Sequence, residues 1–164
     1  MMRAMTTAYD FSLEKLDGGA LPLELFAGHP MVIVNTASHC GFTPQYASLE
    51  ALWKARRDDG LIVLAVPSND FGAQEPGDAA TIAAFCKEKF GIDFPIAGKV
   101  PVRGANAHPL FKWLAAEGGW AARPRWNFYK YLIGRDGRLE GWFSSLTPPD
   151  SGRFQRAVSR LLSS

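Results

Sequence analysis

Two uninterrupted apolar runs, residues 31–34 and 61–66, are the strongest features of the hydrophobic pattern. Both runs are rich in β-branched residues and do not alternate with polar ones, which is typical of parallel strands covered on both faces. Between them, Thr43 and Pro44 precede apolar residues at helical spacing, which predicts a helix with a threonine cap and a proline in its first turn. The order strand, helix, strand predicts a βαβ unit with two parallel strands.

Weaker patterns surround this unit. Residues 9–13 and 21–23 flank an Asp-Gly-Gly turn and predict an N-terminal hairpin. Helices are expected over 78–90, with Asp78 as cap and Gly91 as stop, over 108–116 and over 154–162. Strands 128–133 and 139–143 flank the turn Arg135-Asp136-Gly137 and predict an antiparallel pair. This order of elements predicts an α/β fold with a central mixed sheet and helices on both faces, and a thioredoxin-like arrangement satisfies it.

Length and charge narrow the class of protein. The 164 residues predict a single domain, 1–164, and 47% hydrophobic with 21% charged residues is an ordinary globular composition. A net charge of +2 gives no reason to expect a nucleic-acid partner. The apolar runs are far shorter than the roughly 20 residues of a membrane helix, and no signal peptide is visible. We therefore expect no stable membrane insertion and a cytoplasmic location.

Two cysteines are the candidates for chemistry. Cys40 and Cys86 are too few for a disulfide scaffold, so we expect any function of these cysteines to be chemical rather than structural cross-linking. Cys40 follows the first buried strand and precedes a helix, where α/β sheets bind ligands and a helix N-terminus favours a thiolate. The alternative for Cys40 is a small buried hydrophobic residue, and position alone leaves the two interpretations open. The three histidines share no metal-site spacing and no nucleotide motif occurs, so no cofactor and no metal are expected.

Three segments resemble the signatures of the glutathione peroxidase family, in the family's order. Residues 34–46 read VNTASHCGFTPQY, residues 66–77 read VPSNDFGAQEPG and residues 126–132 read WNFYKYL. The resemblance extends over nearly the whole chain, from about residue 9 to residue 162. It implies a thioredoxin-fold peroxidase that reduces hydrogen peroxide and organic or lipid hydroperoxides. It also implies a catalytic tetrad, which consists of Cys40, Gln74, Trp126 and Asn127.

The chemistry of these four side chains suits peroxide reduction. A thiolate attacks the O–O bond and becomes a sulfenic acid, while neutral amide and indole N–H groups stabilise the departing oxygen anion without titrating themselves. Taken singly, a glutamine in a loop, a tryptophan before a strand and an asparagine in a turn usually have structural roles. Their joint occurrence inside three matching motifs favours the catalytic interpretation.

The role of Cys86 decides the expected reductant. Cys86 shares the apolar face of its predicted helix with Ile82 and Phe85, as an inert core cysteine also would. Residues 85–96 resemble the resolving-cysteine segment of the family's two-cysteine branch, which implies a Cys40–Cys86 disulfide reduced by thioredoxin, with glutathione a poorer donor. Segment 108–125 is short beside the tetrameric members, so a monomer with an open site is expected.

Other functions compete with this interpretation. A one-cysteine, glutathione-dependent peroxidase and a non-enzymatic peroxide-sensing relay share the first chemical step, so the sequence does not separate them. A thioredoxin-like dithiol oxidoreductase is disfavoured, because Thr43 stands where a Cys-x-x-Cys motif needs its second thiol. Compared with many family members, Ser68 replaces a cysteine, Asp70 a glutamine and His39 a lysine. These replacements leave the four tetrad positions intact.

Overall fold

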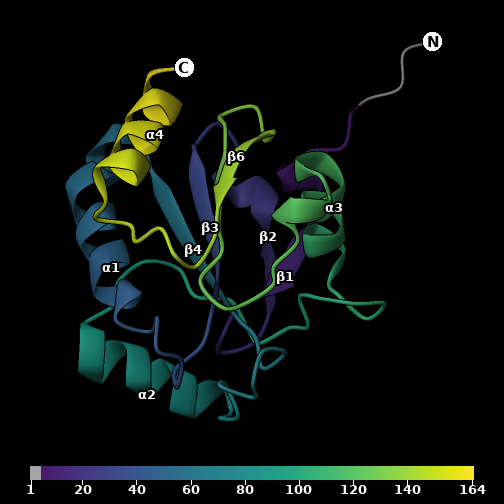
Figure 1. Ribbon diagram of the computed structural model, residues 1–164, viewed down its shortest axis with the longest axis vertical. Helices are drawn as coiled ribbons and strands as arrows, with labels where there is room; N and C mark the ends of the chain where they lie inside the picture. Colours follow the sequence, from purple (N-terminus) through teal and green to yellow (C-terminus); the bar gives the residue numbers. More distant parts are fainter. Residues whose placement is uncertain (1–4) are drawn as a thin grey trace.

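Four strands form one mixed sheet in the order β4-β3-β5-β6 in the computed structural model, which describes residues 5–164 (Figure 1). The apolar runs become β3 (Met31–Thr36) and β4 (Ile62–Pro67), which are parallel. β5 (Lys130–Ile133) is antiparallel to β3, and β6 (Leu139–Phe143) is antiparallel to β5. The predicted βαβ unit and the C-terminal hairpin are therefore confirmed.

Both faces of this sheet are covered by helices. Met31 and Ile33 of β3 join the cluster that contains α3 (Pro109–Gly118), whereas Val32 and Val34 join the cluster of α1 (Gln45–Arg56) and α4 (Gly152–Ser163). Figure 1 shows α3 on one side of the sheet and α1 and α4 on the other. Because residues 31–34 of β3 alternate between two cores, this part of the strand is continuously apolar. The predicted mixed sheet with helices on both faces is confirmed.

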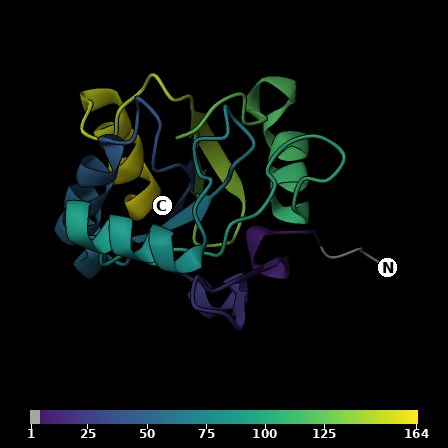
Figure 2. The ribbon, with the colours of Figure 1, turned by 90° about the horizontal axis from the view of Figure 1, so that it is seen from below.

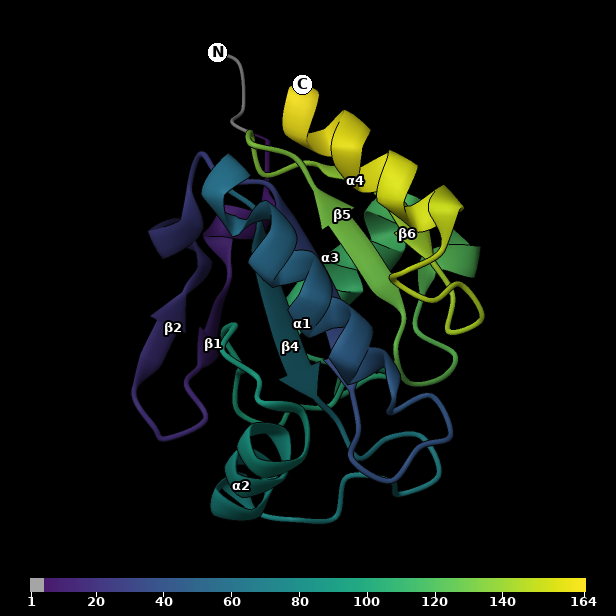
Figure 3. The ribbon, with the colours of Figure 1, turned by 90° about the vertical axis from the view of Figure 1, so that its left-hand side faces the viewer.

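Helix α2 (Ala79–Phe90) lies beyond the carboxyl end of β4 and alongside α1 (Figures 2 and 3). The Asp78 carboxylate accepts a hydrogen bond from the N–H of Thr81, and Gly91 ends the helix with φ +61° in the left-handed region. Both ends agree with the prediction. Ile82 and Cys86 are the buried residues of this helix, so it contacts the core through a narrow stripe.

The N-terminal hairpin is confirmed in kind but is shorter than predicted. β1 (Ser12–Glu14) pairs with β2 (Ala20–Pro22) in an antiparallel ladder. The residues beyond this ladder form short 3-10 turns, η1 (Ala8–Asp10) and η2 (Leu23–Phe26), in place of the outer strand positions. Two further 3-10 turns, η3 (Arg57–Asp59) and η4 (Trp120–Ala122), follow α1 and α3.

The last strand pair and the last two helices differ from the prediction only at their ends. β5 begins at Lys130 and not at residue 128, because Phe128 has a φ of +63°, which no extended strand allows. His108 caps α3 with its ring nitrogen and Ser151 caps α4 with its hydroxyl. Among residues 5–164, no helix combines the length and the apolar character that crossing a bilayer requires.

Candidate active site

The three sequence motifs meet at one end of the sheet. Thr36 at the end of β3 pairs with Pro67 at the end of β4, so the segments that follow these parallel strands begin side by side. β5 is antiparallel to β3, and Lys130 at its start lies opposite Val34. The segment before β5 therefore reaches the same end of the sheet, which is where open α/β sheets bind their ligands.

One backbone N–H group contacts the sulfur of Cys40. The side chain is 7% exposed, and the N–H of Phe42 donates to the Cys40 sulfur at 3.4 Å. The carbonyl of Cys40 accepts from the N–H of Thr43 at 3.0 Å, so the first helix-like turn starts at the cysteine itself. This turn leads into α1, and N–H groups at such a position stabilise a thiolate.

The predicted threonine cap of this helix is wrong. α1 begins at Gln45 with Pro44 as its capping residue, and no side chain caps it. The Thr43 hydroxyl is used elsewhere: it accepts from the N–H of Cys40 at 3.0 Å and donates to the carbonyl of Ala37 at 2.8 Å. Thr43 therefore holds the cysteine loop in shape rather than the helix end.

Gln74 and Asn127 are joined by a hydrogen bond. The Asn127 amide donates to Gln74 Oε1 at 3.1 Å, and this bond leaves the N–H groups of Gln74 for another acceptor. Asn127 is fully buried, and its Oδ1 has no partner within the described residues. The carbonyl of Gln74 accepts from the N–H of His39 at 3.0 Å, which ties this loop to the residue beside Cys40.

Trp126 packs on the same loop. Its ring lies 5.9 Å from that of Phe71, and a Cβ on Gly72 would lie 3.1 Å from the indole and 3.5 Å from the Gln74 side chain. Gly72, with φ +65°, therefore allows the indole to approach the loop. Trp126 also packs against the apolar cluster that contains Cys40. The four predicted site residues thus gather at one end of the sheet.

Asn35 is a supporting residue that sequence reasoning missed. Its side chain is fully buried, donates to the carbonyl of Trp126 at 2.9 Å and accepts from the N–H of Tyr129 at 3.0 Å. The Asn35 carbonyl also accepts from the N–H of Phe128 at 2.6 Å. One signal was available: a polar residue that ends an otherwise apolar strand must find buried partners.

The segment after β6 is hydrogen-bonded to the segment that carries Asn127. The Ser145 hydroxyl donates to the carbonyl of Asn127, and the Gln45 amide donates to the carbonyl of Ser145 at 2.8 Å. Lys130 is fully buried and donates to the carbonyl of Ser144 at 3.1 Å. Burial lowers the pKa of Lys130 to about 7, because its ammonium group has lost its water.

Cys86 is buried away from solvent. It is 1% exposed, and both cysteines are free thiols. Burial raises its pKa to about 11; the Tyr46 hydroxyl beside it opposes this shift and the nearby Glu75 adds to it. Cys86 is therefore a protonated thiol at neutral pH and a poor nucleophile while α2 is intact.

The groups gathered around Cys40 suit sulfur chemistry. They comprise one thiol that accepts from a backbone N–H, two side-chain amides and an indole, which provide a nucleophile and neutral N–H donors. Among residues 5–164, no group of three His, Cys, Asp or Glu side chains is arranged to hold a metal ion. This arrangement can stabilise a thiolate and a leaving oxygen anion.

Comparison with known proteins agrees with this chemistry. The family model described as glutathione peroxidase matches residues 8–115. The chain is also 45% identical over 156 residues to the hydroperoxy fatty acid reductase gpx1 of Synechocystis, an alignment that covers 90% of this chain and 92% of that protein. The chain belongs to the glutathione peroxidase family. As a glutathione peroxidase family member it is a thiol peroxidase that acts on hydroperoxides.

Solved structures support the fold of this glutathione peroxidase family member. The crystal structure of Trgpx in apo form superposes with a TM-score of 0.80 at 33% identity, covering 98% of both chains. A thioredoxin-family thiol:disulfide interchange protein from Chlorobium tepidum gives a TM-score of 0.69 at 16% identity, covering 99% of both chains. That second likeness concerns the fold alone, and with it the predicted thioredoxin-like fold is confirmed.

Proposed function

We propose that Cys40 is the peroxidatic cysteine and that Gln74, Trp126 and Asn127 are the donors that act on its substrate. The observation that carries this assignment is the N–H of Phe42 aimed at the Cys40 sulfur, at the sheet end where Gln74 and Asn127 are hydrogen-bonded. Buried neutral donors of this kind stabilise developing negative charge without changing their own protonation.

The first step of the proposed cycle consumes the peroxide. The Cys40 thiolate attacks the terminal oxygen of the hydroperoxide, an S–O bond forms and the O–O bond breaks. The other oxygen leaves as an alkoxide or hydroxide, takes up a proton and departs as alcohol or water. Cys40 is left as a sulfenic acid, oxidised by two electrons. The amide and indole N–H groups lower the barrier by binding the departing oxygen anion.

The second step assigns Cys86 as the resolving cysteine. Its thiolate attacks the Cys40 sulfur, the S–O bond breaks, and hydroxide leaves and becomes water. The Cys40–Cys86 disulfide is then reduced by the dithiol of thioredoxin, in a cytoplasm that keeps thiols reduced. A buried Cys86 supports a protein reductant, since thioredoxin can bind a surface that rearranges to bring the two sulfurs together.

Peroxide-consumption kinetics with each reductant alone test this proposal. Wild type should turn over with thioredoxin and thioredoxin reductase and slowly with glutathione, whereas Cys40→Ser should consume no peroxide, because a serine hydroxyl is not ionised at neutral pH. Faster turnover with glutathione would indicate a one-cysteine peroxidase. Consumption of a single equivalent with neither reductant supporting turnover would indicate a peroxide-sensing relay.

A further inference from the structure

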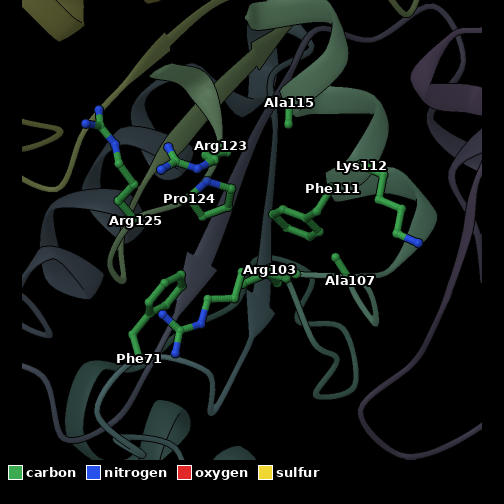
Figure 4. Close-up of a pocket in the computed structure, with 11 residues that line it drawn as sticks. Phe71, Arg103, Ala107, Phe111, Lys112, Ala115, Arg123, Pro124 and Arg125 are labelled. Carbon is green, nitrogen blue, oxygen red and sulfur yellow. The ribbon is translucent and has the colours of Figure 1, made fainter. Parts of the chain in front are cut away.

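A hollow of about 350 Å³ lies between α3 and the loop that carries Phe71 (Figure 4). Its apolar lining comes from segments far apart in the sequence: Phe71, Val102, Ala107, Phe111 and Ala115. The hollow is distinct from the residues that hold Cys40. Its lining suits part of a hydrocarbon chain, since small-molecule sites are apolar hollows with a few well-placed polar groups.

Three arginines at the rim supply the polar groups. Arg103, Arg123 and Arg125 line the hollow, and none of them forms an ion pair within residues 5–164, where the salt bridges involve other cations. Figure 4 shows the Arg103 guanidinium beside Phe71 and the Arg123 guanidinium beside Pro124, whereas the Arg125 guanidinium points away from the hollow and the Lys112 ammonium lies on the opposite side. The rim therefore presents positive charge that no protein carboxylate neutralises.

The guanidinium groups are held in place by aromatic rings and not by acids. Arg103 lies 4.9 Å from the centre of the Phe71 ring, and Arg123 lies 3.9 Å from that of Trp120. Asp70, the acid next to Phe71, is occupied: its carboxylate accepts from the backbone N–H groups of Val102 at 2.7 Å and Arg103 at 3.1 Å. Arg123 also donates to the carbonyl of Trp120 at 3.4 Å and Arg125 to that of Ala121 at 3.2 Å, and the other N–H groups of these guanidinium ions can still bind a ligand.

The hollow adjoins the catalytic end of the sheet. Its wall residue Phe71 packs on Trp126 with ring centres 5.9 Å apart. Arg125 also lines a second, more apolar hollow of about 340 Å³ together with Phe42, Trp126 and Leu146. Phe42 is the residue whose N–H reaches the Cys40 sulfur. A molecule that spans Arg125 would therefore contact both the cationic hollow and the neighbourhood of Cys40.

We propose that the cationic hollow binds the carboxylate of a free fatty-acid hydroperoxide, whose acyl chain crosses Arg125 and presents its O–OH group beside Trp126. This inference rests on the proposed function and adds a recognition site to it. Arginine fits a carboxylate through paired N–H···O bonds, and the second hollow provides apolar cover for the chain. Arg103 and Arg123 place guanidinium groups at a concave hollow, which suits a single carboxylate better than a flat membrane surface does.

The decisive experiment compares linoleic acid hydroperoxide, its methyl ester and hydrogen peroxide as substrates at low salt with thioredoxin as reductant. In the double variant Arg103→Gln/Arg123→Gln, kcat/KM for the acid should fall by about tenfold or more, because charge-assisted hydrogen bonds are lost. The ester and hydrogen peroxide should be reduced at wild-type rates. Arg156→Gln, an exposed site on α4 across the sheet, is the matched control and should change nothing.

Other outcomes overturn the proposal. Equal losses with the acid and the ester mean that no carboxylate is recognised, and a matching loss with phosphatidylcholine hydroperoxide points to a lipid headgroup. Slower reduction of all peroxides at limiting thioredoxin makes the hollow a reductant-docking surface. If the wild-type protein reduces none of the peroxides, the proposed function itself fails. If hydrogen peroxide is turned over normally but the double variant does not discriminate between the acid and the ester, only the proposed recognition site fails.

Discussion

At the scale of single residues, neutral groups set the chemistry at Cys40. The sulfur accepts from a backbone N–H at 3.4 Å, and the amides of Gln74 and Asn127 are joined at 3.1 Å. None of these donors gains or loses a proton between pH 5 and 9, so their support for an oxygen anion does not depend on pH. Asn127 is fully buried, which fixes its amide better than a solvated loop position would.

Removal of any one donor should slow the peroxide step while Cys40 remains. We expect Gln74→Ala, Trp126→Phe and Asn127→Ala each to slow sulfenic acid formation, by on the order of 10²–10³ for a single preorganised donor. Quenched-flow mass spectrometry with a sulfenic acid trap measures this rate directly. Asn106→Ala, at an exposed amide outside the site, is the control. Wild-type rates in all three folded variants would refute the assignment.

Lys130 should give the stability a pH dependence of its own. Its pKa is about 7 in the fold against 10.5 for a free lysine, so between pH 7 and 9 the unfolded chain binds more protons. The free energy of unfolding should therefore rise with pH in this window, by on the order of 2 kcal/mol. Urea titrations of wild type and Lys130→Met should show that the variant lacks this rise. Lys87→Met, at an exposed lysine, should retain it, and equal slopes in all three proteins would contradict the prediction.

At the scale of elements, α2 is the helix most easily released. Only Ile82 and Cys86 of α2 are buried, whereas α1 buries five residues, among them Tyr46 and Leu49. Local opening costs less free energy where fewer apolar contacts hold a segment. The cysteine that the proposed cycle brings to Cys40 thus lies on the α-helix with the fewest buried residues.

The Cys86→Ser variant tests whether this release is part of the cycle. A disulfide needs Cα atoms about 4.4–6.8 Å apart, and we predict that the two cysteines meet only when α2 unwinds. Cys86→Ser should then reduce one equivalent of peroxide, stop as a sulfenic acid and fail to turn over with thioredoxin. Mass spectrometry of oxidised wild type should find the Cys40–Cys86 disulfide, and α2 amides should exchange faster after oxidation.

The matched control for this experiment lies on the same helix. Ala84 is exposed on α2, so Ala84→Ser introduces the same side chain without touching the core and should turn over normally. Normal turnover of Cys86→Ser with thioredoxin would show that Cys86 is only a core residue and that the two-cysteine mechanism is wrong.

At the scale of the whole molecule, most of the segment before Trp126 lies in a helix and a short 3-10 turn. α3 and η4 fill most of residues 109–122, and α3 packs its buried face on the sheet. The hydroxyl of Tyr131 donates to the carbonyl of Ala122 at 2.6 Å, which holds η4 against β5. We therefore expect this segment to build no contact with another subunit.

The protein should therefore sediment as a monomer of 18.0 kDa at micromolar concentration, with a specific activity that is independent of dilution. Analytical ultracentrifugation of the reduced protein measures the mass. Trp120 is 73% exposed and Leu146 is 79% exposed, so these residues are where a contact between copies would form. A dimer or tetramer that dissociates in the Trp120→Ser or Leu146→Ser variant would contradict the monomer and identify its interface.

The sequence by itself determined most of the elements and predicted the site residues. Continuous apolar runs, turn signals and helix caps depend on neighbours within a few residues, so β3, β4, α2 and the C-terminal hairpin are legible from local pattern. Three motifs in a fixed order likewise predict Cys40, Gln74, Trp126 and Asn127 as the site residues.

Only the tertiary structure decided how those residues are held. Gln74 and Asn127 are 53 positions apart, and their hydrogen bond exists because β5 is antiparallel to β3 and brings its amino end to the ends of the parallel strands. The role of Asn35 depends on that same strand order, and so does the position of the left-handed Phe128, whose N–H donates to the Asn35 carbonyl. A buried polar group takes whichever partner the fold places beside it, and no local pattern records that partner.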